Sequence, residues 1–302
     1  MIRLNDLKIS YRIGNRVIDA VDGVNLTIPD RCVVGIAGES GSGKSTLMKA
    51  IYGDIQSPMY LSRGSIDYGL KGSDGQPVTT ANVRREWFKS MSYIPQSSMN
   101  SLNPVIRIRD QFIDFPGADS NKKRVLERAR DYIGKLGLPP EALDSYPHQL
   151  SGGMRQRVMI ALATFFQPEL IIADEPTTAL DVVVQKEILM LLMELQEQMG
   201  NTILVVSHDM GVHYQVTHKM LIMYAGRVVE YGDTDSVFAD PQHPYTRMLI
   251  DSLPTIGDDS MRGVLASAAG AGGDRAYGVT PDLIEVKPGH FAARAEEAGV
   301  SA

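Results

Sequence analysis

The chain has 302 residues, of which 43% are hydrophobic and 22% are charged, and its formal net charge at pH 7 is −6. This composition is that of a globular protein with one large domain and an appendage, or with two modest domains, and the acidic balance argues against a dedicated nucleic-acid binder. Cys32 is the single cysteine and lies in an apolar run, which excludes an internal disulfide or a cysteine-based metal cluster, predicts a buried thiol and favours a reducing cytosol.

Residues 1–37 are predicted to form strands. The N-terminus lacks the apolar centre of a signal peptide, and no stretch reaches the roughly 18 apolar residues of a membrane-spanning helix, so any work at a membrane would need a partner. Val24, Leu26 and Ile28 alternate with polar residues, which is typical of a half-buried strand. Residues 33–37 are continuously apolar, as in a strand that is covered on both faces.

A glycine-rich loop at 38–43 separates this strand from a predicted helix that begins at Lys44 and ends at Tyr52. Residues 38–45 fit the pattern G-x-x-x-x-G-K-[S/T] in its strand–loop–helix setting. Glycines let backbone N–H groups surround phosphate oxygens, and the helix N-terminus favours an anion. Lys44 is predicted to reach the β- and γ-phosphates and Ser45 to bind Mg²⁺, whereas the alternative, a plain glycine-rich turn, explains neither residue.

The middle of the chain alternates between predicted helices and strands. Residues 62–96 mix strand-like pieces with turns, and the pattern becomes helical from about 97 to 165, with a solvated amphipathic helix over 122–136. Two buried strands, at 170–173 and 202–206, flank another helix. The apolar face of that helix is formed by Ile188, Leu191, Leu192, Leu195 and Met199. This alternation predicts an α/β fold with a mostly parallel core sheet.

Two carboxylates follow the strand at 170–173. Asp174 and Glu175 come at its carboxyl end, where open α/β sheets bind their ligands. Asp174 is suited to the Mg²⁺ shell and Glu175 to polarising an attacking water. The alternative is a solvated acidic pair at the end of a strand.

Residues 150–157 read Leu-Ser-Gly-Gly-Met-Arg-Gln-Arg, and this stretch resembles the signature of the ABC ATPases. Ser151, Gly152 and Gly153 at a helix start would form a second phosphate cradle. The resemblance implies that this cradle binds the γ-phosphate on the other protomer of a dimer that encloses two ATP molecules. A helix cap with a glycine hinge is the alternative for the tetrapeptide taken alone.

The resemblance covers roughly residues 1–255 and implies further roles. Gln96 resembles the glutamine that senses Mg²⁺ and water, Ala179-Leu180-Asp181 the loop that crosses between protomers, and His208 the switch histidine. Tyr11 resembles the aromatic that stacks on adenine, with a simple strand tyrosine as the alternative. The implied catalytic residues are Lys44, Gln96, Glu175 and His208, and the implied Mg²⁺ ligands are Ser45, Gln96 and Asp174. The implied nucleotide-binding residues are Tyr11, Gly38, Ser40, Gly41, Ser42, Gly43, Lys44, Ser45, Thr46, Ser151, Gly152, Gly153 and Asp181.

Within the ABC ATPases, the chain is most similar to the oligopeptide/dipeptide importer subunits. The likeness rests on residues 96–104, 174–181 and 243–247 (His-Pro-Tyr-Thr-Arg) and on the closing Pro-Gly-His-Phe at 288–291. Some members carry a C-terminal cysteine cluster that binds iron–sulfur. Since no cysteine follows Cys32, that cofactor is not expected here. The remaining histidines, His148, His213, His218, His243 and His290, are interpreted as surface or core residues.

The resemblance implies a P-loop NTPase fold of ABC type, with an antiparallel β subdomain and a helical subdomain inserted at about 97–165. The expected nucleotide-binding domain is 1–257, followed by an extension at 258–302. Within that extension, the Gly/Ala/Ser-rich 263–278 is interpreted as a flexible linker, and 279–302 is expected either to fold back or to stay mobile.

The implied function is that of the ATP-hydrolysing subunit of an importer at the cytoplasmic face of the membrane. Its expected ligands are ATP and Mg²⁺. Its expected partners are two permeases, a second ATPase subunit that is related or identical, and indirectly an extracytoplasmic solute-binding protein, but no nucleic acid. The cargo would be oligopeptides, oligosaccharides or metal chelates. Two alternatives are a soluble ABC ATPase of translation or DNA repair and a nucleotide-gated module without hydrolysis.

Overall fold

The computed structural model describes residues 1–302 except 73, 97–100, 116–120, 179, 254–276 and 298–302. Its strands are β1 (Ile2–Ile13), β2 (Arg16–Ile28), β3 (Val33–Ala37), β4 (Met59–Asp67), β5 (Met91–Ile94), β6 (Leu170–Asp174), β7 (Thr202–Val206), β8 (Lys219–Tyr224), β9 (Arg227–Asp233), β10 (Tyr277–Lys287) and β11 (His290–Glu297). Its α-helices are α1 (Lys44–Tyr52), α2 (Ile108–Ile113), α3 (Lys122–Lys135), α4 (Gly152–Thr164), α5 (Val182–Met199), α6 (Met210–Val216), α7 (Thr234–Ala239) and α8 (Pro244–Asp251), with 3-10 helices at Val83–Glu86, Pro140–Asp144 and Pro147–Gln149.

The strands form two sheets. The larger has the order β10-β11-β9-β8-β3-β7-β6-β5, and the smaller has the order β2-β1-β4. In the larger sheet β5, β6, β7, β3 and β8 pair in parallel, whereas β9, β11 and β10 continue it in antiparallel fashion. The smaller sheet is antiparallel throughout. This arrangement confirms the predicted α/β fold with a mostly parallel core and an antiparallel β subdomain.

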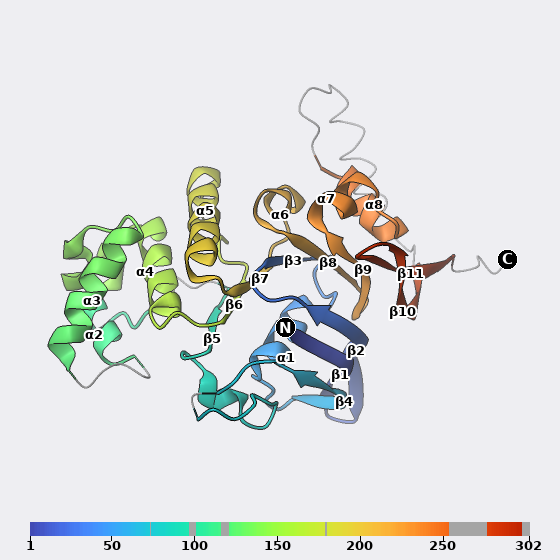
Figure 1. Ribbon diagram of the computed structural model, residues 1–302, viewed down its shortest axis with the longest axis horizontal. Coiled ribbons are helices and arrows are strands. Elements are labelled where there is room, and N and C mark those ends of the chain that lie inside the picture. The colour runs from blue at the N-terminus through green and yellow to red at the C-terminus, as the bar shows by residue number, and fades with distance from the viewer. Residues whose placement is uncertain (73, 97–100, 116–120, 179, 254–276, 298–302) are drawn as a thin grey trace, which may run out of the picture.

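The core sheet is buried on both faces, which explains the continuous apolar runs of its strands. Along β7, Leu204 and Val206 pack with β1, β2 and α1 in one hydrophobic cluster. Ile203 and Val205, which point to the opposite face, pack with α3, α4 and α5 in another. The period of two therefore places the antiparallel sheet on one side and helices on the other (Figure 1).

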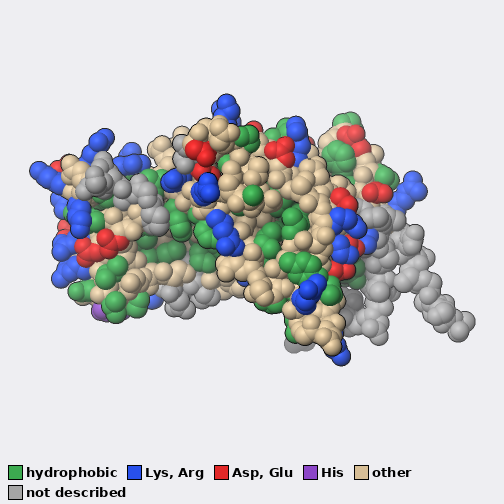
Figure 2. Space-filling view, turned by 90° about the horizontal axis from the view of Figure 1, so that it is seen from below, with side chains coloured by type: hydrophobic (Ala, Val, Ile, Leu, Met, Phe, Trp, Pro, Cys, Tyr) green, Lys and Arg blue, Asp and Glu red, His purple; other side chains and the backbone are tan. Residues whose placement is uncertain are grey.

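The helices α2, α3 and α4, inserted between β5 and β6, form a lobe at the left end of Figure 1. Aromatic side chains help to fill it, because Phe112 and Tyr132 both make edge-to-face contacts with Phe165. On the face drawn in Figure 2, Lys and Arg side chains gather on this lobe, and hydrophobic side chains line the hollow between the lobe and the rest of the molecule. No helix among the described residues is long and apolar enough to cross a membrane.

The tail returns to the core sheet. β10 and β11 form an antiparallel hairpin, and β11 pairs with β9 through Phe291 opposite Tyr231 and Ala292 opposite Glu230. Of the two expectations for 279–302, folding back is therefore the one that the described strands show. The linker expected at 263–278 lies outside the described residues up to 276, but Tyr277 and Gly278 belong to β10, so the linker interpretation is wrong for these two residues. The domain boundary at 257 stays a prediction.

Candidate active site

The loop between β3 and α1 has the backbone geometry of a phosphate cradle. Gly38 and Gly43 have φ angles of 144° and 101°, which side-chain-bearing residues rarely adopt. A Cβ atom at Gly38 would lie 2.2 Å from the Met223 carbonyl oxygen, and one at Gly43 would lie 2.3 Å from the Ala20 carbonyl oxygen. Both positions therefore require glycine, because the loop passes directly against neighbouring backbone.

Lys44, the first residue of α1, is held under this loop. Its Nζ donates hydrogen bonds to the carbonyl oxygens of Gly38 and Glu39, both at 2.7 Å. Burial lowers the pKa of Lys44, and the nearby carboxylates of Glu175 and Asp174 oppose that shift. Since its hydrogen-bond partners are neutral carbonyls, the ammonium charge is directed by the loop but is not neutralised by it.

Asp174, at the end of β6, lies beside the start of α1. The Ser45 hydroxyl donates to Asp174 Oδ1 at 3.3 Å, and the Tyr93 hydroxyl donates to Oδ2 at 2.8 Å. Burial and the nearby Asp174 raise the pKa of Tyr93, so its phenol stays protonated and remains a donor. A hydroxyl and a carboxylate meeting at the phosphate loop form an oxygen donor set of the kind that Mg²⁺ prefers.

Glu175 is positioned by two donors. Gln96 Nε2 donates to its Oε2 at 2.8 Å, and the Thr178 hydroxyl donates to the same oxygen at 2.9 Å. Its backbone has φ 49°, in the left-handed region. His208, which follows the neighbouring strand β7, places Nδ1 3.9 Å from Glu175 Oε1. The side chain of His208 is 76% exposed, so it is open to a ligand.

The phosphate loop, Gln96, Glu175 and His208 line one cavity of about 410 Å³, and Asp174 lies beside it through its bond with Ser45. Its lining comprises Ala20, Gly38, Ser40, Gly41, Gly43, Lys44, Ser45, Thr46, Gln96, Glu175 and His208. Tyr11 is linked to this region, because its hydroxyl shares a 3.2 Å hydrogen bond with the Thr46 hydroxyl. The structure thus brings together the predicted residues of the phosphate loop, both strand ends and the glutamine.

The signature residues and Asp181 are not among the residues that line this cavity. Ser151 caps α4, where its side chain accepts from the Met154 N–H at 3.3 Å. Asp181 caps α5 by accepting from the Val184 N–H at 3.0 Å. Gly152 and Gly153 form the half-buried first turn of α4, and Ala179 lies outside the described residues. Their local geometry fits a helix cap, and a role in a second subunit's site stays a prediction.

Three contacts at the site involve residues to which the sequence analysis assigns no individual role. Tyr93 donates to Asp174 and Thr178 donates to Glu175, while the Tyr245 hydroxyl accepts from the Glu39 N–H at 2.7 Å. Thr178 could have been suspected, because it follows Glu175 by three residues. Tyr93 and Tyr245 depend on strand order and on a distant helix, which the local sequence does not encode.

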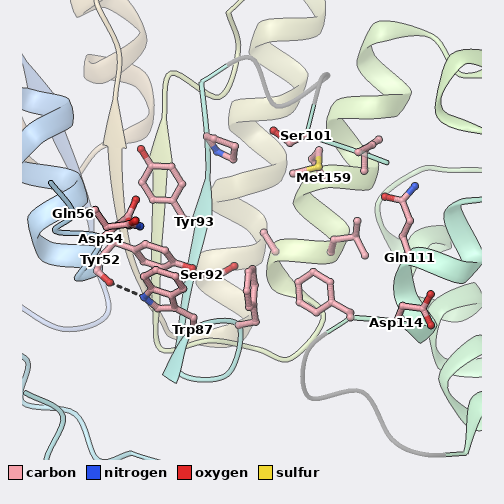
Figure 3. A pocket seen from close by; sticks show the side chains of 16 residues that line it. Tyr52, Asp54, Gln56, Trp87, Ser92, Tyr93, Ser101, Gln111, Asp114 and Met159 are labelled. Atoms are coloured by element: carbon pink, nitrogen blue, oxygen red, sulfur yellow. Dashed lines mark hydrogen bonds between the residues drawn. The ribbon is translucent and has the colours of Figure 1, made fainter. Parts of the chain in front are cut away.

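A second, larger cavity of about 530 Å³ separates the helical lobe from the core. In Figure 3, Tyr52, Trp87 and Tyr93 form one side of it, and Gln111 and Asp114 lie on the other. The Trp87 and Tyr52 rings stack with centroids 4.7 Å apart, and Trp87 Nε1 donates to the Tyr52 carbonyl oxygen. Its lining is rich in aromatic and aliphatic side chains, with acidic groups from Asp54 and Asp114.

Two family models match this chain. The model of the ABC transporter family matches residues 21–178, which is just over half of the chain. The chain belongs to this family. A second model, described as the C-terminal region of oligopeptide/dipeptide transporters, matches residues 229–274 of this ABC ATPase.

Curated relatives cover most of this ABC ATPase. The dipeptide transport ATP-binding protein DppD of Escherichia coli is 40% identical over 89% of this chain and 83% of its own length. The oligopeptide transport ATP-binding protein OppD of Bacillus subtilis is 39% identical over 85% and 72%, respectively. AmiE of Streptococcus pneumoniae, also named an oligopeptide transport ATP-binding protein, is 38% identical over 86% and 74%.

Solved structures of ABC cassettes share the fold. The ATP-binding cassette MJ0796, in a dimeric post-hydrolysis state bound to ADP and Pi, has a TM-score of 0.64 at 28% identity and covers 78% of this chain and 99% of its own. The cassette cbiO1 of Clostridium perfringens, part of an ABC transporter complex, has a TM-score of 0.66 at 26% identity and covers 79% and 90%.

Proposed function

We propose that this chain is the ATP-hydrolysing subunit of an ABC importer for oligopeptides or dipeptides, bound at the cytoplasmic face of the membrane. The observation that carries the proposal is the cavity in which Lys44, Ser45 and Gln96 meet the two strand-end residues Glu175 and His208. Peptide cargo is supported by the names of the relatives; cargo selection itself lies in the permeases and the solute-binding protein.

In this proposal the phosphate loop binds the nucleotide through its backbone N–H groups and Lys44. Mg²⁺, when bound, neutralises charge on the β- and γ-phosphates. Ser45 and Asp174 are the residues that would hold it, with Gln96 beside them. Tyr11 would stack on the base, and its hydrogen bond with Thr46 in α1 supports this assignment.

Glu175 orients the attacking water and polarises it. Gln96 and Thr178 both donate to one of its oxygens, which leaves Oε1 directed toward His208 and the cavity. The exposed imidazole of His208 then stabilises charge that spreads over the transferred phosphoryl group. Both groups that hold the carboxylate are neutral donors.

The nucleotide site is completed by a second ATPase subunit, identical or related. Ser151, Gly152, Gly153 and Asp181 do not line the cavity of their own chain, yet Ser151 is exposed at the N-terminus of α4, where the helix favours an anion. We assign this cradle to the nucleotide held by the partner subunit. The dimeric state of the MJ0796 cassette supports that assignment.

The permeases contact the cavity between the lobe and the core. Its aromatic wall offers apolar area, and Asp54 and Asp114 add negative charge at its edge. Ser101 and Leu102, which directly follow the undescribed residues 97–100, also line it. Gln96, which donates to Glu175, precedes these two residues in the chain and would connect a permease contact at Ser101 and Leu102 with the site of hydrolysis.

The transport assignment is tested by identifying the proteins that co-purify with this chain. We would solubilise native membranes, purify the chain in mild detergent and identify the associated proteins by mass spectrometry. Recovery of two permeases, with or without a second ATPase, is the expected result. Recovery with ribosomes or DNA from the soluble fraction would replace the importer with an ATPase of translation or repair.

The test of the chemistry is Glu175→Gln in the purified complex. Loss of the general base is expected to lower kcat by at least about a hundredfold while ATP binding is retained. Phosphate release measures kcat, and an equilibrium binding assay measures ATP affinity. Glu169→Gln, at the exposed opposite end of β6, is the matched control. Unchanged turnover in Glu175→Gln would remove the assigned role.

A further inference from the structure

A buried tyrosine from the C-terminal part of the chain touches the phosphate loop. Tyr245, in the first turn of α8, is fully buried, and its ring packs 4.6 Å from that of Tyr224. Its hydroxyl oxygen accepts a hydrogen bond from the Glu39 N–H at 2.7 Å. Burial raises the pKa of Tyr245, so its side chain is a neutral phenol at neutral pH.

The peptide group that Tyr245 contacts belongs to the turn that holds Lys44. The carbonyl oxygens of Gly38 and Glu39 both accept from Lys44 Nζ. The Glu39 N–H is thus fixed by α8, and the Glu39 carbonyl fixes the lysine. A change in the position of Tyr245 would therefore reach the Lys44 ammonium through one intervening residue, Glu39.

The start of α8 is in turn held by a buried carboxylate. Glu230, on β9, accepts from the Gln242 N–H at 2.8 Å and from the His243 N–H at 2.9 Å. His243 Nδ1 then accepts from the Tyr245 N–H at 3.2 Å and so caps the helix. Because Glu230 is fully buried, these bonds form away from water, where the loss of a partner is costly.

The tail hairpin binds the same carboxylate. His290, the first residue of β11, places Nε2 2.7 Å from Glu230 Oε1 and is only 1% exposed. Lys287, at the end of β10, also pairs with Asp240 at the surface. The two sequence motifs that the hydrolytic mechanism leaves unused, 243–247 and 288–291, therefore converge on Glu230.

We propose that Tyr245 is a positioning residue for the phosphate loop and that the tail hairpin, through His290 and Glu230, holds the helix that carries it. The inference rests on the ATP site proposed above. It gives the C-terminal extension a part in nucleotide affinity, because the hairpin preorganises the loop before the ligand arrives. Glu175 and His208 are not in this linkage, so it acts on binding and not on turnover.

The decisive variant is Tyr245→Phe, which removes the hydroxyl and keeps the ring. Loss of one hydrogen bond to the loop is expected to weaken MgADP binding to the full chain by about three- to tenfold in isothermal titration. The KM of the complex for ATP is expected to rise by a similar factor with kcat unchanged. Tyr132→Phe is the matched control, because it loses a buried 2.7 Å hydroxyl contact with Thr164 in the helical lobe.

The tail is tested by His290→Ala, with Lys287→Ala as the control that removes only the exposed ion pair of the same hairpin. His290→Ala is expected to weaken MgADP binding in the same direction as Tyr245→Phe, and Lys287→Ala to leave it unchanged. In the double variant the two losses are expected to be less than additive, since both act through one linkage.

The outcomes separate this inference from the proposed function. A wild-type chain that does not bind MgADP would contradict the proposed ATP site. Binding by the wild type with equal affinity in Tyr245→Phe would overturn the positioning role. Additive losses, or a His290→Ala variant that melts at a lower temperature but binds normally, would show that the hairpin supports the fold without reaching the phosphate loop.

Discussion

At the scale of single residues, the site depends on neutral donors that hold charged groups. Tyr93 and Thr178 donate to Asp174 and Glu175, respectively, and the loop carbonyls of Gly38 and Glu39 receive Lys44. A neutral partner fixes the direction of a charge without cancelling it. The Lys44 ammonium and the carboxylates of Asp174 and Glu175 are thereby held in fixed directions beside the phosphate loop.

A buried histidine makes the stability of this region depend on pH. His213, on α6, is fully buried and its Nε2 lies 3.0 Å from the Ser207 carbonyl oxygen. Burial lowers the pKa of His213 to about 4 from 6.5. Because the unfolded chain takes up this proton first, the stability that His213 contributes is present above pH 6.5 and is lost as the pH falls toward 4.

We therefore expect acidification from pH 7.5 to pH 5 to cost the wild type about 2 kcal/mol more unfolding free energy than it costs His213→Gln. Urea titrations of both proteins at the two pH values measure the difference, and the variant controls for every other titrating group. Equal losses in the two proteins would show that His213 is protonated in the folded chain.

The sequence predicts those site residues that lie close to one another along the chain. Lys44 and Ser45 follow the loop glycines directly, and Glu175 follows Asp174, so local patterns suffice to find them. Tyr93 reaches Asp174 because β5 pairs with β6, and this neighbour order is a property of the whole sheet. The sequence of one segment therefore does not predict which strands are neighbours in the sheet.

At the scale of elements, helix caps and phosphate cradles are built from the same groups. Ser151 caps α4 through its hydroxyl and is exposed, whereas the two glycines that follow it are half-buried. The structure thus satisfies the cap interpretation, and this alone does not separate it from the signature role. The two roles differ in how they respond to a negative charge.

Ser151→Asp separates them. Asp caps a helix as well as Ser does, so the unfolding free energy is expected to stay within about 0.5 kcal/mol of wild type. If the cradle binds a γ-phosphate, the added carboxylate repels it, and the ATPase rate of the complex is expected to fall at least about tenfold. Ser151→Thr is the control that keeps both functions. Normal hydrolysis in Ser151→Asp would leave Ser151 as a cap only.

At the scale of the molecule, three hydrophobic clusters share one central sheet. Continuous apolar runs correctly predict β3, β6 and β7, because these strands are covered on both faces. The helical spacing of apolar residues correctly predicts α5, because one face of that helix is buried. The docking of β11 on β9 was left open by the sequence, since a hairpin rich in exposed residues has no strong period. The position of β11 in the sheet is set by its pairing with β9.

The cavity between the helical lobe and the core makes a prediction for the assembled transporter. Asp114 lies on its exposed edge. Reversal of this charge in Asp114→Lys is expected to reduce the yield of co-purified permease several-fold, because it reverses the electrostatic match at the contact. ATP binding by the chain is expected to stay normal. The yield is measured by quantitative mass spectrometry of the detergent-purified complex.

Asp131→Lys supplies the control for that experiment, since Asp131 is equally exposed on α3 but does not line the cavity. Equal permease recovery from both variants would move the contact to another face of the molecule.

The place of β3 in the core sheet has a consequence for synthesis of the protein. β3 is made early, yet it is hydrogen-bonded between β7 and β8, which begin at residues 202 and 219. While the chain emerges from the ribosome, β1, β2 and β4 can pair with one another. β3, which leads into the phosphate loop, cannot pair until β7 and β8 have been synthesised. A nascent chain cut short before β7 has no cradle, so nucleotide stabilises only the late steps of folding.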